Sequence, residues 1–160
     1  MGLFSFLKYQ NQIAESILPA AAKSQLLSGN LPLIKTSSIF LKRGEQCVYI
    51  DKAILNDHVK KKIYRHAGGS SPGFFKGTRI NYGTGHAKEY EETEQHKGIL
   101  CITNQRVIFQ SLRKGFDKQH RYLSSIEPYA NAVVLQYGEK NYELIVPDGS
   151  IVNAAIRLVN

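Results

Sequence analysis

The first thirty positions carry apolar residues at the spacing of a helix. These residues are Leu3, Phe6, Leu7, Ala14, Ile17, Leu18 and Ala21. Their spacing predicts a helix over residues 3–28, which Pro19 breaks or kinks. A second short helical piece, AAAKSQLLS, should stop at Gly29 and Asn30, residues that favour helix ends. We therefore expect an N-terminal helical segment over residues 1–38.

From Ile39 onward the pattern is that of short strands. The runs are QCVYI, KIYRH, FFKGTRINY, GILCIT, RVIFQ, RYLSSIEPY, AVVLQY and YELIV. A polar stretch, LNDHVKK, is expected to separate the first two strands. Only Asn104 and Gln105 separate GILCIT from RVIFQ, which predicts a tight hairpin. RYLSSIEPY should be an edge strand that ends at Pro128.

The last third of the chain predicts two alternating strands and a closing helix. Val133, Leu135 and Tyr137 should share one face of their strand. Asp148 or Ser150 can cap the helix that follows. Strands joined by short turns imply an antiparallel sheet, and a single helix can cover only one end of it. We therefore expect an α+β, mainly β fold, in which residues 39–160 form a small antiparallel barrel capped by the C-terminal helix.

The glycine-rich stretch His66–Gly85 raises the question of a phosphate-binding loop. It holds six of the thirteen glycines. A Walker loop needs a lysine after its second glycine, but Phe74 follows Gly73. The dinucleotide fingerprint fails as well, because no apolar helix follows these glycines. We interpret them as residues that allow bulges and sharp bends in strands.

Composition adds a strong positive charge and little catalytic chemistry. The formal net charge is +8, but the carboxylates of Glu89 to Glu94 separate the basic clusters, which indicates a mixed solvated surface. Cys47 and Cys101 lie in apolar runs and are expected to be small core residues of a reducing compartment. The five histidines have no metal-ligand spacing, and no nucleophile motif is present. We expect no enzyme activity, no cofactor and no metal site, in a chain that is cytoplasmic by default.

The run KGILCITNQRVIF contains a more specific pattern: a glycine, a short apolar strand, Thr-Asn-x-Arg and an apolar triplet. Its key positions are Gly98, Thr103, Asn104 and Arg106. This pattern resembles the hairpin of the PH/GRAM-like domains of bacterial and phage proteins, and the resemblance covers roughly residues 40–160. It implies a pleckstrin-like barrel capped by a helix, and a role in binding.

The same hairpin can be interpreted without the family. Asn104 tolerates the backbone angles of a turn, and the Thr103 hydroxyl can hold that turn locally. Arg106 is expected to reach a carboxylate or backbone carbonyls and thereby fix the register of the strands. We therefore expect Gly98, Thr103, Asn104 and Arg106 to be structural.

Three classes of partner remain open. The first is another protein, bound by a barrel edge, by the final helix or by the apolar N-terminal residues Leu3, Phe4, Phe6 and Leu7. The second is an anionic membrane surface, with basic candidates Lys60, Lys61, Lys62, Arg65, Lys76 and Arg79. The third is nucleic acid, stacked on aromatics among these basic residues. We expect a protein partner, with membrane association as the alternative, and the sequence leaves a homo-oligomer open.

Overall fold

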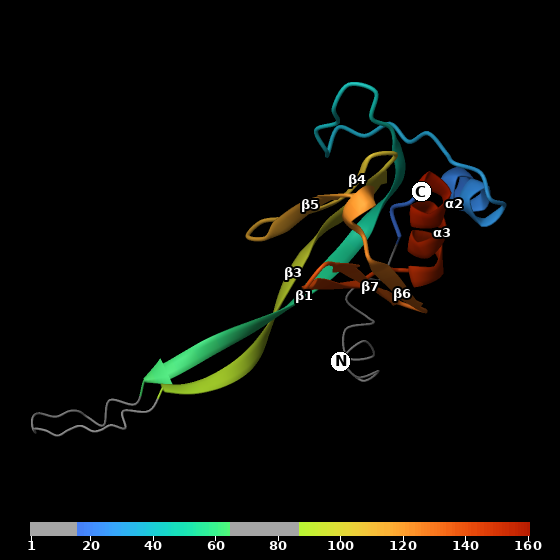
Figure 1. Cartoon of the computed structure of the whole chain (residues 1–160). Helices are drawn as coiled ribbons and strands as arrows, with labels where there is room; N and C mark the ends of the chain where they lie inside the picture. Colours follow the sequence, from blue (N-terminus) through green and yellow to red (C-terminus); the bar gives the residue numbers. More distant parts are fainter. Residues whose placement is uncertain (1–15, 65–86) are drawn as a thin grey trace, which may run out of the picture. The chain divides into compact units, whose positions relative to one another are not determined.

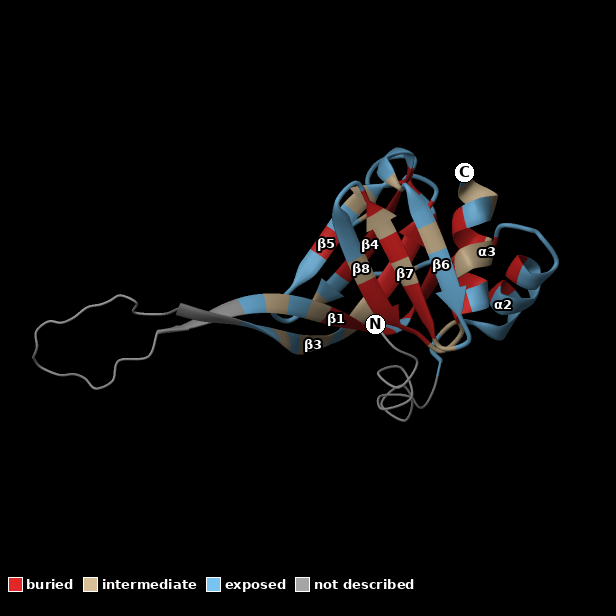
Figure 2. Ribbon diagram, turned by 60° about the horizontal axis from the view of Figure 1, so that its bottom comes forward, coloured by how far each residue is buried: buried red, intermediate tan, exposed pale blue. Residues whose placement is uncertain are grey.

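The computed structural model describes residues 16–64 and 87–160, and the side chains of residues 16–60 and 90–160. Most of its elements are labelled in Figure 1, and β8 is labelled in Figure 2. They are α2 (Ala20–Leu27), β1 (Cys47–Tyr64), β3 (Ala87–Thr103), β4 (Arg106–Ser111), β5 (Gly115–Gln119), η4 (His120–Tyr122), β6 (Ser125–Tyr129), β7 (Ala132–Tyr137), β8 (Lys140–Ile145) and α3 (Gly149–Val159). Two compact units are described separately: Met1–Asp57 with Gln95–Asn160, and His58–Glu94.

One seven-stranded sheet organises the chain, in the order β5-β4-β3-β1-β8-β7-β6. Every strand pair with a recorded register is antiparallel. Two meanders make up this order, β1-β3-β4-β5 and β6-β7-β8, and the pairing of β1 with β8 joins them. With the C-terminal helix α3, this is the PH-like, mainly β fold expected from the sequence. The expected closure into a barrel is wrong: the sheet stays open, and β5 and β6 are its two ends.

The lengths of the first two strands differ from the prediction. QCVYI and KIYRH were expected as separate strands, but β1 runs without a break through the polar residues between them, from Cys47 to Tyr64. The acidic run of residues 89–94, expected in a solvated loop, lies on β3. Neighbouring antiparallel strands form hydrogen bonds between their backbone N–H and C=O groups, whatever their side chains are. Polar residues can therefore continue a strand whose faces are solvated. β5 was not predicted at all.

Hydrophobic side chains pack on both faces of the sheet. Along β3 and β4, Leu100 and Phe109 belong to the main core beneath α3, whereas Cys101 and Ile108 belong to a second cluster on the opposite face. Residues 18–41 cover this second cluster with side chains such as Ile34. The buried positions follow the strands of the first unit (Figure 2).

An aromatic contact shows how strongly the sheet coils. The ring of Phe116 on β5 stacks on Tyr142 of β8, with centroids 4.0 Å apart. Three strands lie between β5 and β8 in the sheet order. The contact is therefore made through the concave side of a curved sheet, whose twist brings distant strands together.

The C-terminal helix begins as the sequence predicted. Asp148 is the N-cap of α3, and its Oδ1 accepts a hydrogen bond from the Ser150 amide at 2.9 Å. Ile151, Val152 and Ala155 are buried against the sheet. In the described ranges, no helix combines the length and the apolar character that crossing a bilayer requires.

Candidate binding groove beside the edge strand

β6 is an end strand of the sheet and pairs on one side with β7. Residues Ala130 and Asn131 form the two-residue turn between them, so the flanking pair Tyr129 and Ala132 closes the hairpin. Hydrogen-bonded and non-bonded pairs alternate in an antiparallel ladder. The backbone groups of Ile126 and Pro128 therefore face away from β7. Pro128 has no N–H, which suits an outward position on an edge.

A groove lies beside this edge, between β6 and the last turns of α3. Its volume is about 460 Å³. The lining residues come from η4 and its exit, from β6 and from α3: His120, Leu123, Ser124, Ser125, Ile126, Ile156, Arg157 and Asn160. Ile156 is buried and Ile126 half-buried, so the floor is apolar, while the serines and Arg157 are exposed. The groove therefore combines an apolar floor with a polar rim.

Arg157 supplies the positive charge of the groove. It lies in the last turn of α3, where a cation also interacts favourably with the helix dipole. Its Nε donates to Asn153 Oδ1 at 3.0 Å, which fixes the side chain along the helix. No acidic residue is among those that line the groove. Arg157 can therefore attract a carboxylate of a bound ligand.

His120 forms the buried inner wall of the groove. Its Nε2 lies 2.7 Å from the Thr103 carbonyl oxygen, which can only accept, so Nε2 carries the proton. Burial lowers the pKa of His120, against the smaller opposing effects of this hydrogen bond and of Glu45. The imidazole is therefore neutral near pH 7 and anchors η4 to the end of β3.

The Thr-Asn-x-Arg hairpin lies next to this anchor and forms a buried ionic network. Arg106 Nε lies 2.8 Å from Glu45 Oε2, and Arg106 Nη2 lies 3.0 Å from Glu45 Oε1. Arg106 also donates to Asp117 on β5 and to the Phe40 carbonyl oxygen. Thr103 Oγ1 donates to Glu45 Oε2 at 2.6 Å. Arg106 thus reaches both carboxylates and a carbonyl, the kinds of group expected from the sequence.

Asn104 ties the hairpin turn to the residues before β1. Its Oδ1 accepts from the Gln46 amide at 2.8 Å, and its Nδ2 donates to the Gly44 carbonyl oxygen at 3.2 Å. Gly98, the first residue of the pattern, lies on β3 opposite Ser111. These contacts hold the hairpin in place. Arg106 also lines a second pocket of about 430 Å³, together with Phe40, Lys42 and residues of β4 and β5.

Most of the predicted partner-facing residues fall outside the described part of the chain. These are Leu3, Phe4, Phe6, Leu7, Arg65, Lys76 and Arg79, together with the glycine-rich strand of residues 74–82. Lys60 is exposed on β1; the backbones of Lys61 and Lys62 continue the same strand, and their side chains are not described. The basic and apolar candidate surfaces remain predictions.

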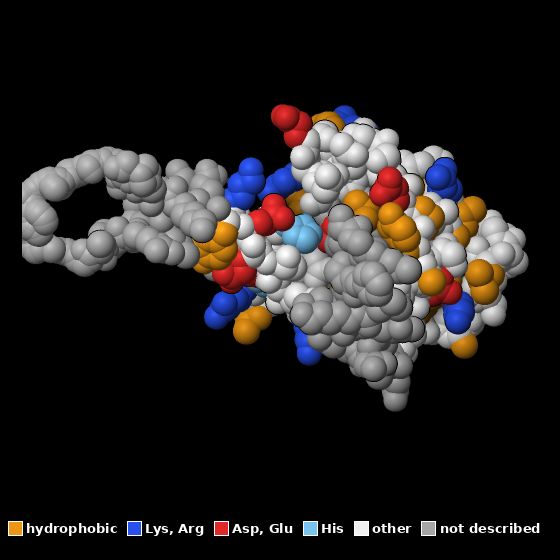
Figure 3. All heavy atoms as spheres, turned by 90° about the horizontal axis from the view of Figure 1, so that it is seen from below, with side chains coloured by type: hydrophobic (Ala, Val, Ile, Leu, Met, Phe, Trp, Pro, Cys, Tyr) orange, Lys and Arg blue, Asp and Glu red, His pale blue; other side chains and the backbone are white. Residues whose placement is uncertain are grey.

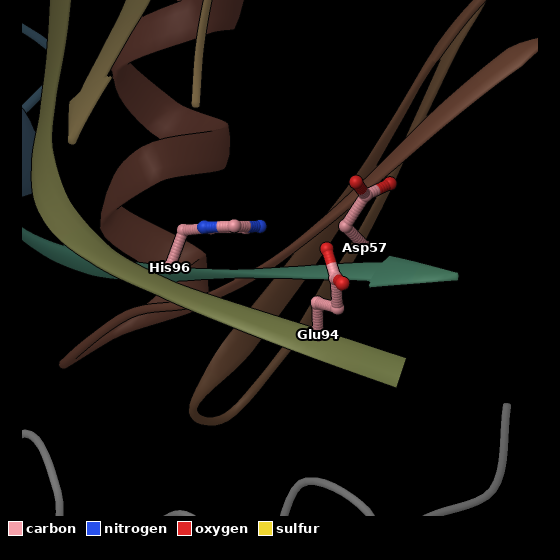
Figure 4. A group of neighbouring side chains, drawn as sticks. All are labelled: Asp57, Glu94 and His96. Carbon is pink, nitrogen blue, oxygen red and sulfur yellow. The ribbon is translucent and has the colours of Figure 1, made fainter. Parts of the chain in front are cut away.

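Charged side chains of both signs are interspersed on the described part of the face in Figure 3. Figure 4 shows Asp57 on β1, and Glu94 and His96 on β3. In the first unit, Asp57 Oδ2 lies 2.7 Å from the Nζ of Lys114. This ion pair compensates the charge of Lys114, and the mixed-surface interpretation stays a prediction.

Sequence reasoning named the barrel edge and the final helix but missed the residues that line the groove. His120 was interpreted as exposed or as a lone hydrogen bonder, and it is a buried hydrogen bonder. Arg157 had one usable signal, its place in the last turn of the predicted helix. Nothing in the sequence indicated that this turn faces β6.

The sequence matches no family model and no curated protein. Among solved structures, the chain is similar to the Vps36 N-terminal PH domain, with a TM-score of 0.45 and 13% sequence identity. The similarity covers 80% of this chain and 91% of that chain. The fold itself is PH-like by its strand order and its C-terminal helix.

Proposed function

We propose that this protein is a non-catalytic binding module that takes up an extended, acidic peptide segment of another protein in the groove between β6 and α3. The observation that carries the proposal is that β6, which among the described strands pairs with β7 alone, lies next to a groove with an apolar floor and an arginine at its rim. A PH-like fold is consistent with a binding role. Partner peptides commonly add as a further strand to such an edge.

The chemistry of the groove sets the expected ligand. The outward N–H and C=O of Ile126 can form a pair of hydrogen bonds with an antiparallel peptide, whereas Pro128 offers only its carbonyl oxygen. An apolar peptide side chain fits against Ile126 and Ile156 on the groove floor. An acidic side chain or a terminal carboxylate would pair with Arg157.

A random peptide library displayed on phage tests this proposal. Peptides enriched on the wild-type protein should contain an acidic residue and should bind Arg157→Glu at least tenfold more weakly in fluorescence titrations. Lys140→Glu is the matched control, since it makes the same charge change at an exposed residue of β8 outside the groove. Equal binding to both variants would contradict the proposed site.

Backbone amides give a second readout. A peptide that adds to β6 converts the outward Ile126 amide from a solvated group to a hydrogen-bonded one, so its hydrogen exchange should slow on binding. The exchange of the Ile145 amide on β8 should not change, because β8 lies between two strands of the sheet. An enriched peptide that leaves Ile126 exchange unchanged would show that the edge is not used.

The membrane alternative rests on basic residues of which Lys60 alone has a described side chain. Flotation with phosphatidylserine vesicles at low salt distinguishes it from peptide binding. The proposal expects no flotation that depends on Arg157. Flotation that Arg157→Glu abolishes would assign the groove to a lipid headgroup instead.

A further inference from the structure

The two cysteines of the chain lie side by side. Cys47 begins β1 and Cys101 lies on β3, the neighbouring strand of the sheet. Their Sγ atoms are 3.3 Å apart and both thiols are free. A disulfide bond of roughly 2.05 Å therefore needs an approach of only about 1.3 Å, which side-chain rotation can supply. The sequence places these residues 54 positions apart, so it gave no sign of the contact.

The contact makes the two thiols chemically unequal. The hydrogen bond that Cys47 shares with Cys101 lowers the pKa of the Cys47 thiol and outweighs burial, which raises it. The same hydrogen bond and burial both raise the pKa of Cys101. Cys47 is therefore the thiol that loses its proton first and reacts first with an oxidant, and Cys101 is the resolving thiol.

A cover controls access to the pair. Both cysteines are fully buried in the second hydrophobic cluster, beneath Ala22, Ile34 and Ile39 of the segment that precedes β1. This segment, residues 18–41, is joined to β1 by a single isolated bridge, in which the Ile34 amide donates to the Cys47 carbonyl oxygen at 2.9 Å. The segment is also held by Arg106, which donates to the Phe40 carbonyl oxygen, and by Leu26, which is buried in the main core. Within the described residues it forms no continuous ladder with β1, so we expect local opening of the cover to need less free energy than unfolding of the sheet.

We propose that Cys47 and Cys101 are a redox-sensitive pair that closes to a disulfide when hydrogen peroxide reaches it, and that residues 18–41 control this access. The Cys47 thiolate attacks one peroxide oxygen; the O–O bond breaks, leaving Cys47 as a sulfenic acid and hydroxide, which takes up a proton to become water. Cys101 sulfur then attacks Cys47 Sγ, and the expelled hydroxide combines with the Cys101 proton as a second water. Two thiols and one peroxide yield one disulfide and two waters.

Mass spectrometry of the full chain after peroxide treatment tests the chemistry. The wild-type protein should lose two hydrogen atoms, become inert to iodoacetamide after unfolding, and regain both thiols with dithiothreitol. Peptide mapping should find Cys47 linked to Cys101 in the same chain. Cys101→Ser should stop at a sulfenic acid on Cys47 that dimedone traps, whereas Cys47→Ser should react more slowly. Oxygen addition without a link, or only links between chains, would overturn the proposal.

A pair of neighbouring substitutions tests the cover. Ile34→Ala removes a buried contact over Cys47 and should speed the loss of thiols by roughly tenfold or more, because it favours local opening. Leu33→Ala is the matched control, since Leu33 is 65% exposed, and it should leave the rate unchanged. Circular dichroism checks that both variants are folded; Ile34→Val replaces Ile34→Ala if the latter unfolds. Equal rates in the Ile34 and Leu33 variants would show that the segment does not control access.

Discussion

Arg106 joins the segment before β1 to strand β5. Its guanidinium binds Glu45 before β1, Asp117 on β5 and the Phe40 carbonyl oxygen. The Thr-Asn-x-Arg pattern identified Arg106 and the kind of group it would reach. Its partner Glu45 lies 61 positions away and could not be chosen from the other carboxylates without the fold. At this scale the sequence predicts the kind of group that Arg106 binds, and the tertiary structure decides which residue supplies that group.

The acid stability of the protein should depend on Glu45. Burial alone would raise the pKa of this carboxyl, but hydrogen bonds from Arg106, Thr103 and the Lys42 amide lower it from 4.5 to about 2. Because the folded-state pKa is the lower one, the stabilisation is complete above about pH 4.5 and is lost as the pH falls toward 2. In Glu45→Gln, the free energy of unfolding should change less with pH between about pH 4.5 and 2, a range that we call the acid limb. At pH 7 the substitution should lower the free energy of unfolding by about 3 kcal/mol.

Urea unfolding of the Glu45 variant across the acid range provides the measurement. The control is Glu139→Gln, an exposed residue in the turn before β8, which should keep the wild-type pH profile. A Glu45 variant that retained the full acid limb would place the titrating group elsewhere.

His120 should remain a neutral imidazole with its proton on Nε2 at pH values where an ordinary histidine is protonated. Its pKa is lowered mainly by burial, and the carbonyl of Thr103 accepts from Nε2. The 15N shifts of the two ring nitrogens report both the tautomer and the pKa in one pH titration. Half-protonation at or above pH 6.5 would contradict this assignment.

At the scale of elements, the best predicted feature is the hairpin of β3 and β4. The two runs that meet at its turn, GILCIT and RVIFQ, are almost wholly apolar, and the structure pairs Ile102 with Val107 across the expected turn. The outer parts of β1 and β3 were missed because they are polar and do not alternate. An alternating pattern of apolar residues indicates a strand with one buried face. A strand that is stabilised mainly by backbone hydrogen bonds to its neighbour has no such pattern in its sequence.

Gly98 should be intolerant of any side chain. A Cβ at this position would lie 2.0 Å from the carbonyl oxygen of Gln110 on β4, and that oxygen belongs to the paired backbone. Gly98→Ala should therefore force the two strands apart and lower the free energy of unfolding by about 1–3 kcal/mol. Lys97→Ala, at the exposed neighbouring position, should cost less than about 0.5 kcal/mol in the same denaturant titration. A similar decrease in the free energy of unfolding in both variants would contradict the steric explanation.

At the scale of the whole molecule, the sheet of the first unit has a different cover on each face. The face toward α3 holds the main core, to which Leu26 of α2 also belongs, and Ala22, Ile34 and Ile39 cover the other face. Asp51 on β1 holds the start of the described chain: its carboxylate accepts from Ser16 Oγ and from the Ile17 amide, the latter at 2.7 Å. The N-terminal cover is therefore held by polar contacts, by the second hydrophobic cluster and by Leu26 in the main core.

Loss of the Asp51 contacts should loosen the cover and spare the sheet. Asp51→Asn replaces one acceptor by a donor, so hydrogen exchange in residues 17–27 should accelerate by roughly tenfold while α3 stays protected. Lys52→Gln, at the exposed next position, should leave exchange unchanged. Faster exchange in α3 as well would show that the cover and the core open together.

The sequence by itself determined the hairpin of β3 and β4, the strands β7 and β8, their antiparallel sense, a C-terminal helix capped by Asp148 or Ser150, and the expectation of a PH-like fold. These features depend on local patterning: alternation along a strand, short turns, and a cap next to an apolar stripe. The tertiary structure alone decided that β6 and α3 enclose a groove, that Glu45 pairs with Arg106, and that Cys47 meets Cys101. Such contacts join residues far apart in the chain, and their geometry is set by how a twisted sheet coils and which segment covers it.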